Sequence, residues 1–283
     1  MADIGKVNGV IAANLGIVNG VAIANIGKVN TIIKASGGTA TTFLTKQASW
    51  GNGAADGTSG AFGLGRHPTN WRSTTDTVFG FISATRSWNS DSGGTTSSSG
   101  TGPSAGHDAS QGIDGDGREG ASTDDYIYTE ASSQFNKRML LRTPELDFTD
   151  ALDNDTLKLY FWFHMHGSNM GALGVSATSN ATSAGDNGLS KHFTSDTAGG
   201  LTIVFWDTND DDGSSTASGV RITGEQQTEG HGNTTVDAHW RLASVDLTDL
   251  AGESSVYLWF FGKTGGSFRS DMCIDDVEVV GEE

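Results

Sequence analysis

Short apolar segments separated by turn residues constrain the fold of this chain more than any other feature of its sequence. None of these segments sustains the 3.6-residue period of an amphipathic helix, and several, such as residues 256–261, alternate in the two-residue period of a strand. The strand candidates are Asp125–Ala131, Met139–Leu141, Leu157–His166, Leu173–Ala177, Leu201–Trp206, Ala243–Asp246, Val256–Phe261 and Cys273–Val280. We therefore expect an all-β fold in which two antiparallel sheets form a jelly-roll sandwich.

The composition agrees with this expectation and excludes some classes of function. The chain holds 40 Gly but only 3 Pro, which is typical of many short strands joined by tight turns. The formal net charge of −17 disfavours binding to nucleic acid, because the surface repels phosphates. The single cysteine, Cys273, excludes an intramolecular disulfide and indicates assembly in a reducing cytoplasm.

Residues 2–34 contain three copies of an 11-residue unit, in which apolar residues recur as Ile4, Val7 and Val10 do in the first copy. The first two copies also carry an Asn-Gly turn signal, so short turns or strands are expected here rather than a long helix. Three such units cannot bury their apolar side alone. We therefore expect an attachment or oligomerisation segment, with a trimer favoured; the alternative is a run of strands packed against the same domain.

The apolar stretch 9–27 raises the question of a signal peptide or a membrane span. Asn14, Asn19 and Asn25 interrupt it, which disfavours both. The expected organisation is an N-terminal repeat segment at 1–34, a Gly/Ser/Thr-rich arm or set of extra strands at 35–87, and a β-sandwich domain at 88–283.

Four segments of the sandwich region resemble the MAM domain, an extracellular adhesion module. They are Thr101–Pro103 with His107 and Asp108, Tyr126–Ser132, Phe161–Leu173 and Ile274–Val277. The resemblance runs from near Trp88 to about Val280 and implies a jelly roll that binds rather than catalyses. The chain departs from the family by lacking its paired cysteines and by a long insert from 180 to 200. The repeat at 2–34 resembles repeats at the start of some virion proteins of tailed phages.

The MAM resemblance also implies a calcium site, because carboxylates from separated segments can supply the hard oxygen ligands that this ion requires. The expected ligands are Asp108, Glu130, Asp275 and Asp276, with Asp271 in reserve. Neighbouring residues in a strand point to opposite faces, so Asp275 and Asp276 are not both expected as ligands unless one acts through its carbonyl. The alternative is that these carboxylates only accept hydrogen bonds in turns.

Other motifs do not indicate catalysis or nucleotide binding. The acidic run at 207–213 lacks the glycine and the final glutamate of a calcium-binding EF-hand loop. The glycine pattern at 115–120 carries acidic residues that would repel a pyrophosphate. Trp162 and Trp259 are expected in the core. The tryptophans expected to be freer, near loops, are Trp50, Trp71, Trp206 and Trp240.

These features favour a non-enzymatic structural protein of a phage virion, of the fibre, collar or capsid-decoration type. It would be assembled in the host cytoplasm and exposed on the extracellular particle. Its expected partners are other virion proteins, through residues 1–34, and a host-surface glycan; nucleic acid and membrane are not expected. The alternatives are a carbohydrate-binding adhesin of a bacterial surface and, with less support, an enzyme that depolymerises glycans.

Overall fold

The computed structural model describes residues 41–50, 70–74, 86, 88–92, 101–151, 156–178, 221–230 and 239–282, together with short strand segments elsewhere. Four strand pairs lie outside the two main sheets. They are β1 (Lys6–Val7) with β2 (Val10–Ile11), β3 (Ile17–Val18) with β4 (Val21–Ala22), β8 (Thr77–Val78) with β9 (Ile82–Ser83), and β15 (Asp196–Ala198) with β16 (Leu201–Ile203). The first two pairs flank the Asn-Gly dipeptides of the repeat, as the turn signal predicts.

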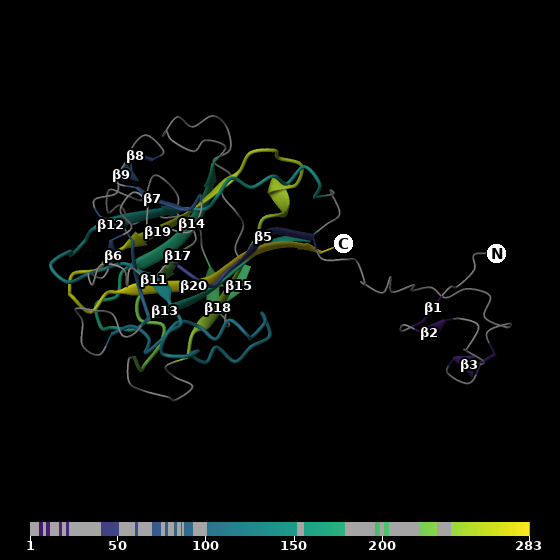
Figure 1. Cartoon of the computed structure of the whole chain (residues 1–283), viewed down its shortest axis with the longest axis horizontal. Coiled ribbons are helices and arrows are strands. Elements are labelled where there is room, and N and C mark those ends of the chain that lie inside the picture. The colour runs from purple at the N-terminus through teal and green to yellow at the C-terminus, as the bar shows by residue number, and fades with distance from the viewer. Residues whose placement is uncertain are drawn as a thin grey trace.

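Two antiparallel sheets make up the body of the protein (Figure 1). The seven-stranded sheet contains β5 (Thr41–Gln47), β6 (Gly60–Ala61), β10 (Asn89–Asp91), β11 (Tyr126–Tyr128), β13 (Thr156–Met165), β18 (Arg241–Asp246) and β20 (Met272–Glu282). The five-stranded sheet contains β7 (Arg72–Thr74), β12 (Arg138–Arg142), β14 (Ala172–Thr178), β17 (Arg221–Thr223) and β19 (Tyr257–Lys263). The one helical element among the described residues is a short 3₁₀ turn, Thr248–Leu250.

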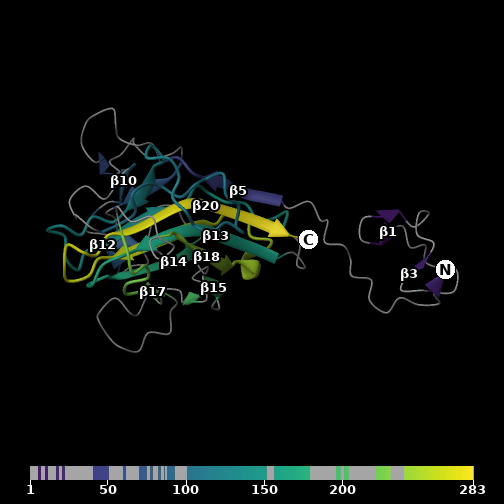
Figure 2. The same cartoon turned by 90° about the horizontal axis from the view of Figure 1, so that it is seen from below.

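The chain crosses between the sheets at most connections, because β11, β13, β18 and β20 lie in one sheet while β12, β14 and β19 lie in the other. Figure 2 shows the two sheets as stacked layers. The expected all-β, two-sheet sandwich is therefore confirmed. Seven of the strand candidates coincide with β11, β12, β13, β14, β18, β19 and β20. Of the eighth, Leu201–Trp206, β16 covers the first three residues, and the rest lies outside the described residues.

Apolar side chains from both sheets fill the space between them. In β13, Leu157, Leu159, Phe161, Phe163 and Met165 alternate along the strand and belong to this core. Their two-residue period places all of them on one face of the sheet, where burial of each large side chain stabilises the fold by about 1.5–3 kcal/mol. The core thus follows directly from the sequence pattern of this strand.

A second, smaller cluster lies apart from this core. It consists of Tyr126, Tyr128, Trp162, Trp240 and Cys273, with Leu242 packed against it. Trp162 is out of phase with the inward-facing residues of β13, so it projects from the opposite face of the seven-stranded sheet. The connection that runs from residue 101 to β11 packs on this outer face: the His107 ring stacks on Trp162, and the indole N–H of Trp240 donates to the carbonyl of Ala105.

The burial of the tryptophans corrects part of the expectation. Trp162 and Trp259 are buried, as predicted. Trp50, Trp71 and Trp240, expected to be freer, are at most 2% exposed. Loop position did not predict exposure, because the connections that carry these residues lie over the sheets and turn their indoles inward. Trp206 lies outside the described residues.

Strand β20 organises the larger sheet. It pairs with β13 along one edge, while its other edge is shared by β11 over residues 273–274 and by β5 over residues 277–281. Residues 275 and 276 lie where the neighbour changes from β11 to β5. The strands from residues 41–91 join both sheets, and the proposed domain boundary at residue 88 stays a prediction.

Candidate functional site

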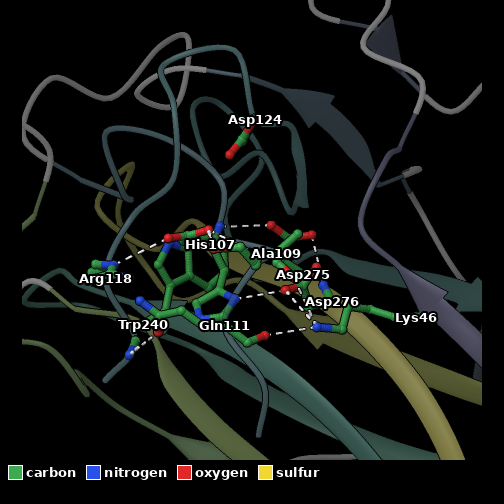
Figure 3. Close-up of polar contacts among 12 residues, drawn as sticks. Lys46, His107, Ala109, Gln111, Arg118, Asp124, Trp240, Asp275 and Asp276 are labelled. Carbon is green, nitrogen blue, oxygen red and sulfur yellow. Dashed lines mark hydrogen bonds and ion pairs between the residues drawn. The ribbon is translucent and has the colours of Figure 1, made fainter. Parts of the chain in front are cut away.

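A bulge in β20 brings two neighbouring carboxylates to the same place. In the pairing with β13, Tyr160 lies opposite Glu278 and Trp162 opposite Asp275, so β20 carries one extra residue there. Asp276 adopts a left-handed conformation at this point, with φ of 47°. The extra residue breaks the alternation of side chains, and both Asp275 and Asp276 contact His107 (Figure 3). The expectation that they point to opposite faces is therefore wrong.

Asp275 accepts hydrogen bonds from three buried N–H groups. Its donors are the indole N–H of Trp50 at 2.9 Å, the backbone N–H of His107 at 2.8 Å and the backbone N–H of Asp276 at 2.8 Å. Its residue is 1% exposed. Burial, followed by the charge of Asp276, raises the pKa of the Asp275 carboxyl well above its usual range, although the hydrogen bonds oppose this shift. Asp275 thus joins three segments of the chain.

His107 is held between Asp276 and an aromatic ring. Its Nδ1 atom lies 2.8 Å from Oδ2 of Asp276, and its ring stacks on Trp162 with centroids 4.0 Å apart. Its Nε2 atom is buried and has no hydrogen-bond partner among the described residues. A paired His and Asp could serve in acid–base chemistry, but a proton acceptor must reach its substrate. With Nε2 covered, this pair is suited to holding the loop on the sheet rather than to catalysis.

Lys46 of β5 brings a positive charge to the same cluster. Its ammonium group donates to the backbone carbonyls of Ala109, at 3.2 Å, and Gln111, at 2.9 Å, and lies 4.0 Å from Oδ2 of Asp276 (Figure 3). Two loop carbonyls and a carboxylate are the oxygen donors that calcium also prefers. Lys46 therefore supplies from within the chain the charge that a bound cation would provide.

The expected calcium ligands do not meet at one point. Asp108 accepts hydrogen bonds from Ser110 and faces Arg118 at 3.2 Å, and these contacts lower the pKa of its carboxyl. Glu130 accepts a hydrogen bond from the backbone N–H of Ser132. Asp271, the reserve ligand, is buried and accepts from the N–H of Ala131 and the hydroxyl of Thr101. Only Asp275 and Asp276 of the expected set lie together around His107.

Among the described residues, no three His, Cys, Asp or Glu side chains are grouped as metal ligands. One observation does favour a cation, because Oδ1 of Asp276 is buried without a hydrogen-bond partner. Calcium binding at Asp276 stays a prediction. An ion there would have to displace the Lys46 ammonium from the two loop carbonyls.

This competition gives a test. In Lys46→Met, which removes the ammonium but keeps the apolar stem, we expect millimolar calcium to raise the melting temperature by several degrees more than in the wild type. Binding to the folded state alone stabilises it by mass action. Thermal unfolding with and without calcium measures the difference, with magnesium as the control ion. An equal response of both proteins would exclude a cation site at Asp276.

A different candidate surface lies at one end of the sandwich. Phe135 and Phe268, each 44% exposed, are the exposed large hydrophobic residues of the described part. They lie on two connections, residues 131–137 between β11 and β12 and residues 264–271 between β19 and β20, which we call the loop tip. Backbone hydrogen bonds join these connections: the N–H of Asn136 donates to Gly265, and the N–H of Thr264 to Lys137. Two aromatic rings are thus presented by two mutually braced loops.

Phe135, Phe268 and the basic residues beside them were not singled out from the sequence, because an isolated phenylalanine in a polar loop carries no periodic signal. One available signal was charge. The stretches 131–144 and 254–270 contain no acidic residue in a chain with 34 of them, yet they include Lys137, Lys263 and Arg269. Their meeting at one end of the fold depends on strand pairing between β12 and β19.

Similar solved structures are distant. An adhesin domain of Lys-gingipain from Porphyromonas gingivalis matches over 85% of this chain and 96% of its own, at 14% identity and a TM-score of 0.39. A cyclase from Fischerella matches over 86% and 98%, at 13% identity and a TM-score of 0.43. A putative sugar-binding protein from Bacteroides thetaiotaomicron matches over 74% and 92%, at 14% identity and a TM-score of 0.31.

No family model matches the sequence. Because the TM-scores lie below 0.5 and the three proteins differ in activity, these similarities establish neither the fold nor the activity of this chain. The sandwich rests on its own strand pairing, and the MAM and virion relationships stay predictions. Within the part of the chain that the structure describes, no helix is long and apolar enough to cross a bilayer.

Proposed function

We propose that the protein is a non-enzymatic adhesion module of a phage virion, attached through residues 1–34 and presenting the loop tip to a glycan of the host surface. The observation that carries this proposal is that two features lie at opposite ends of the sandwich. Strand β5, which follows the N-terminal segment, begins at one end of the fold. The exposed aromatic residues Phe135 and Phe268 lie at the other end.

Strand pairing defines these two ends. Thr41, where β5 begins, lies opposite Gly281 near the end of β20. The connection 264–271 instead leads into Met272, where β20 begins. Since β20 has 11 residues at about 3.3 Å each, the two ends are separated by roughly 30–35 Å. In Figures 1 and 2 the β19–β20 connection lies at the end of the sandwich opposite the C-terminus. An anchor that precedes β5 would therefore leave the loop tip facing outward.

The chemistry of the buried cluster supports a binding role over a catalytic one. The His107–Asp276 pair is covered by Trp162 and is 1–2% exposed. The only thiol, Cys273, is buried, and this burial raises its pKa well above the usual range, which suppresses the nucleophilic thiolate. These titratable groups serve the packing of the loop layer on the sheet. New reducing ends after incubation with host polysaccharide would instead support the depolymerase alternative.

Deletion of residues 1–34 tests the attachment. We expect the deleted protein to fold with a melting temperature near that of the full chain, because β5 and the sheets lie downstream, but to be lost from assembled particles. Incorporation is measured by the amount of the protein in purified particles after complementation.

The matched control is Phe135→Ser in the full chain, which alters the loop tip and should leave incorporation unchanged. Incorporation of the deleted protein at the normal level would contradict the proposed anchor. Binding of the deleted protein to host cells would then favour the alternative, a surface adhesin whose binding does not depend on the repeat.

A further inference from the structure

We propose that the loop tip binds an anionic polysaccharide, with the rings of Phe135 and Phe268 against sugar faces and the side chains of Lys137, Lys263 and Arg269 against carboxylate or sulfate groups. This inference rests on the proposed function and names the chemical class of its ligand.

The aromatic part of the surface is held in place by its surroundings. The hydroxyl of Thr264 donates to the carbonyl of Gln134 at 2.6 Å, and the backbone N–H of Lys137 donates to Thr264 Oγ1 at 2.9 Å. The Gly265 N–H donates to the hydroxyl oxygen of Ser270, and this bond joins the two ends of the second connection, residues 264–271. Loops fixed in this way lose little conformational entropy on binding, and this favours affinity for a ligand that offers few contacts.

The charge of the surface is opposite to that of the whole molecule. The chain carries 34 acidic and 17 basic residues, yet Lys137, Lys263 and Arg269 lie on or beside the loop tip. None of these three side chains forms an ion pair with a described residue. The Arg269 guanidinium lies 5.5 Å from the centroid of the Phe268 ring, so charge and ring are adjacent. Unpaired cations beside exposed rings are complementary to a ligand that carries negative charge on an apolar ring.

The described acidic groups in or beside the loop tip already have local donors. Asp271, at the end of the second connection, is buried and accepts from the N–H of Ala131 and the hydroxyl of Thr101. Glu225 accepts from the backbone N–H of Gly167 and lies 3.1 Å from Nδ1 of His166. Glu130 accepts from the N–H of Ser132. These hydrogen bonds partly offset their negative charge, and among the residues that the structure describes the three cations form no ion pair. An acidic protein repels an anionic polymer over most of its surface, so this layout also orients the approach of the ligand.

Partial exposure of the two rings favours a glycan over a lipid surface. At 44% exposure, each phenylalanine leaves only part of its surface open to a ligand. Insertion into a bilayer requires more buried apolar area than two half-covered rings supply. Stacking against the apolar face of a sugar requires only the exposed part of a ring.

The full chain is tested by calorimetric titration and affinity electrophoresis against polygalacturonate, a sulfated dextran, neutral dextran and vesicles of anionic phospholipid. We expect binding to polygalacturonate or sulfated dextran, with the two arms showing whether carboxylate or sulfate is preferred, and at least tenfold weaker binding to neutral dextran. Phe135→Ser with Phe268→Ser should weaken binding at least tenfold. Arg269→Gln should weaken it severalfold and reduce its dependence on salt.

The control variant is Arg118→Gln, which removes an exposed cation bonded to Asp108, away from the loop tip, and should leave affinity unchanged. Binding is compared only among variants whose melting temperature equals that of the wild type, so that a loss of affinity does not reflect unfolding. Equal affinity for neutral dextran, unchanged affinity of the double variant, or binding only to vesicles would overturn the inference. Host-cell binding by the full chain that persists in the double variant would overturn it while leaving the proposed adhesion intact, whereas loss of host-cell binding in that variant supports both.

Discussion

Replacement of Asp275 by alanine is expected to lower the free energy of unfolding by about 3–5 kcal/mol. The side chain accepts hydrogen bonds from Trp50, His107 and Asp276, and all three donors are buried with it. A buried donor left without its acceptor costs about 1–3 kcal/mol, and removal of a buried charge returns part of that cost. Urea unfolding followed by tryptophan fluorescence measures the change, since Trp50 reports on this site.

Two further variants separate the lost hydrogen bonds from the lost carboxyl group. Asp275→Asn keeps one acceptor oxygen and the shape of the side chain, so its stability should fall between those of the alanine variant and the wild type. Asp147→Ala removes an exposed carboxylate that accepts from Thr149 in a turn, where water can replace it, and should have a much smaller effect. Equal losses in Asp275→Ala and Asp147→Ala would show that the buried donors do not depend on Asp275.

The sequence predicted, with their bounds, the strands that bury apolar side chains, whereas for residues 35–87 it indicated only an arm or a set of extra strands. Strand β13 is predicted by apolar residues that alternate along its length and lie in the core. Strand β5 offers no such pattern, because of its seven residues only Leu44 is buried. Its extended state comes from pairing with β20, which is more than 220 residues away in the chain. Pairing between strands so far apart in the chain produces no pattern in the local sequence. The contribution of residues 41–91 to both sheets could therefore not be predicted.

At the buried cluster, the acidic pair is visible in the sequence but its surroundings are not. Asp275 and Asp276 were singled out, but strict strand alternation separated them. The bulge that unites them depends on the left-handed backbone at Asp276, a conformation that Asp tolerates better than most residues but that a single sequence does not reveal. Lys46 and Trp50 reach the site only through tertiary structure. Local pattern thus located the acidic pair, and long-range packing decided what it does.

Replacement of Gly117 by alanine is expected to cost about 3 kcal/mol of unfolding free energy. Gly117 has φ of 77°, and an added Cβ would overlap the carbonyl oxygen of Trp240 and press on the Trp162 ring. A left-handed conformation costs a residue with a side chain about 1–2 kcal/mol, and overpacking adds about 1–3 kcal/mol. The backbone cannot simply move away, because the carbonyl of Gly117 accepts from the N–H of Trp240 at 2.7 Å.

Gly224→Ala is the matched control for this variant. Gly224 has nearly the same φ, 74°, but an added Cβ would meet nothing within 4 Å, so only the conformational cost of about 1–2 kcal/mol remains. The difference between the two variants in urea unfolding therefore isolates the close packing of the loop that contains Gly117 on Trp240 and Trp162. If both variants lose the same stability, this loop does not rest on the outer face of the seven-stranded sheet, and the covering of His107 that disfavours catalysis would no longer hold.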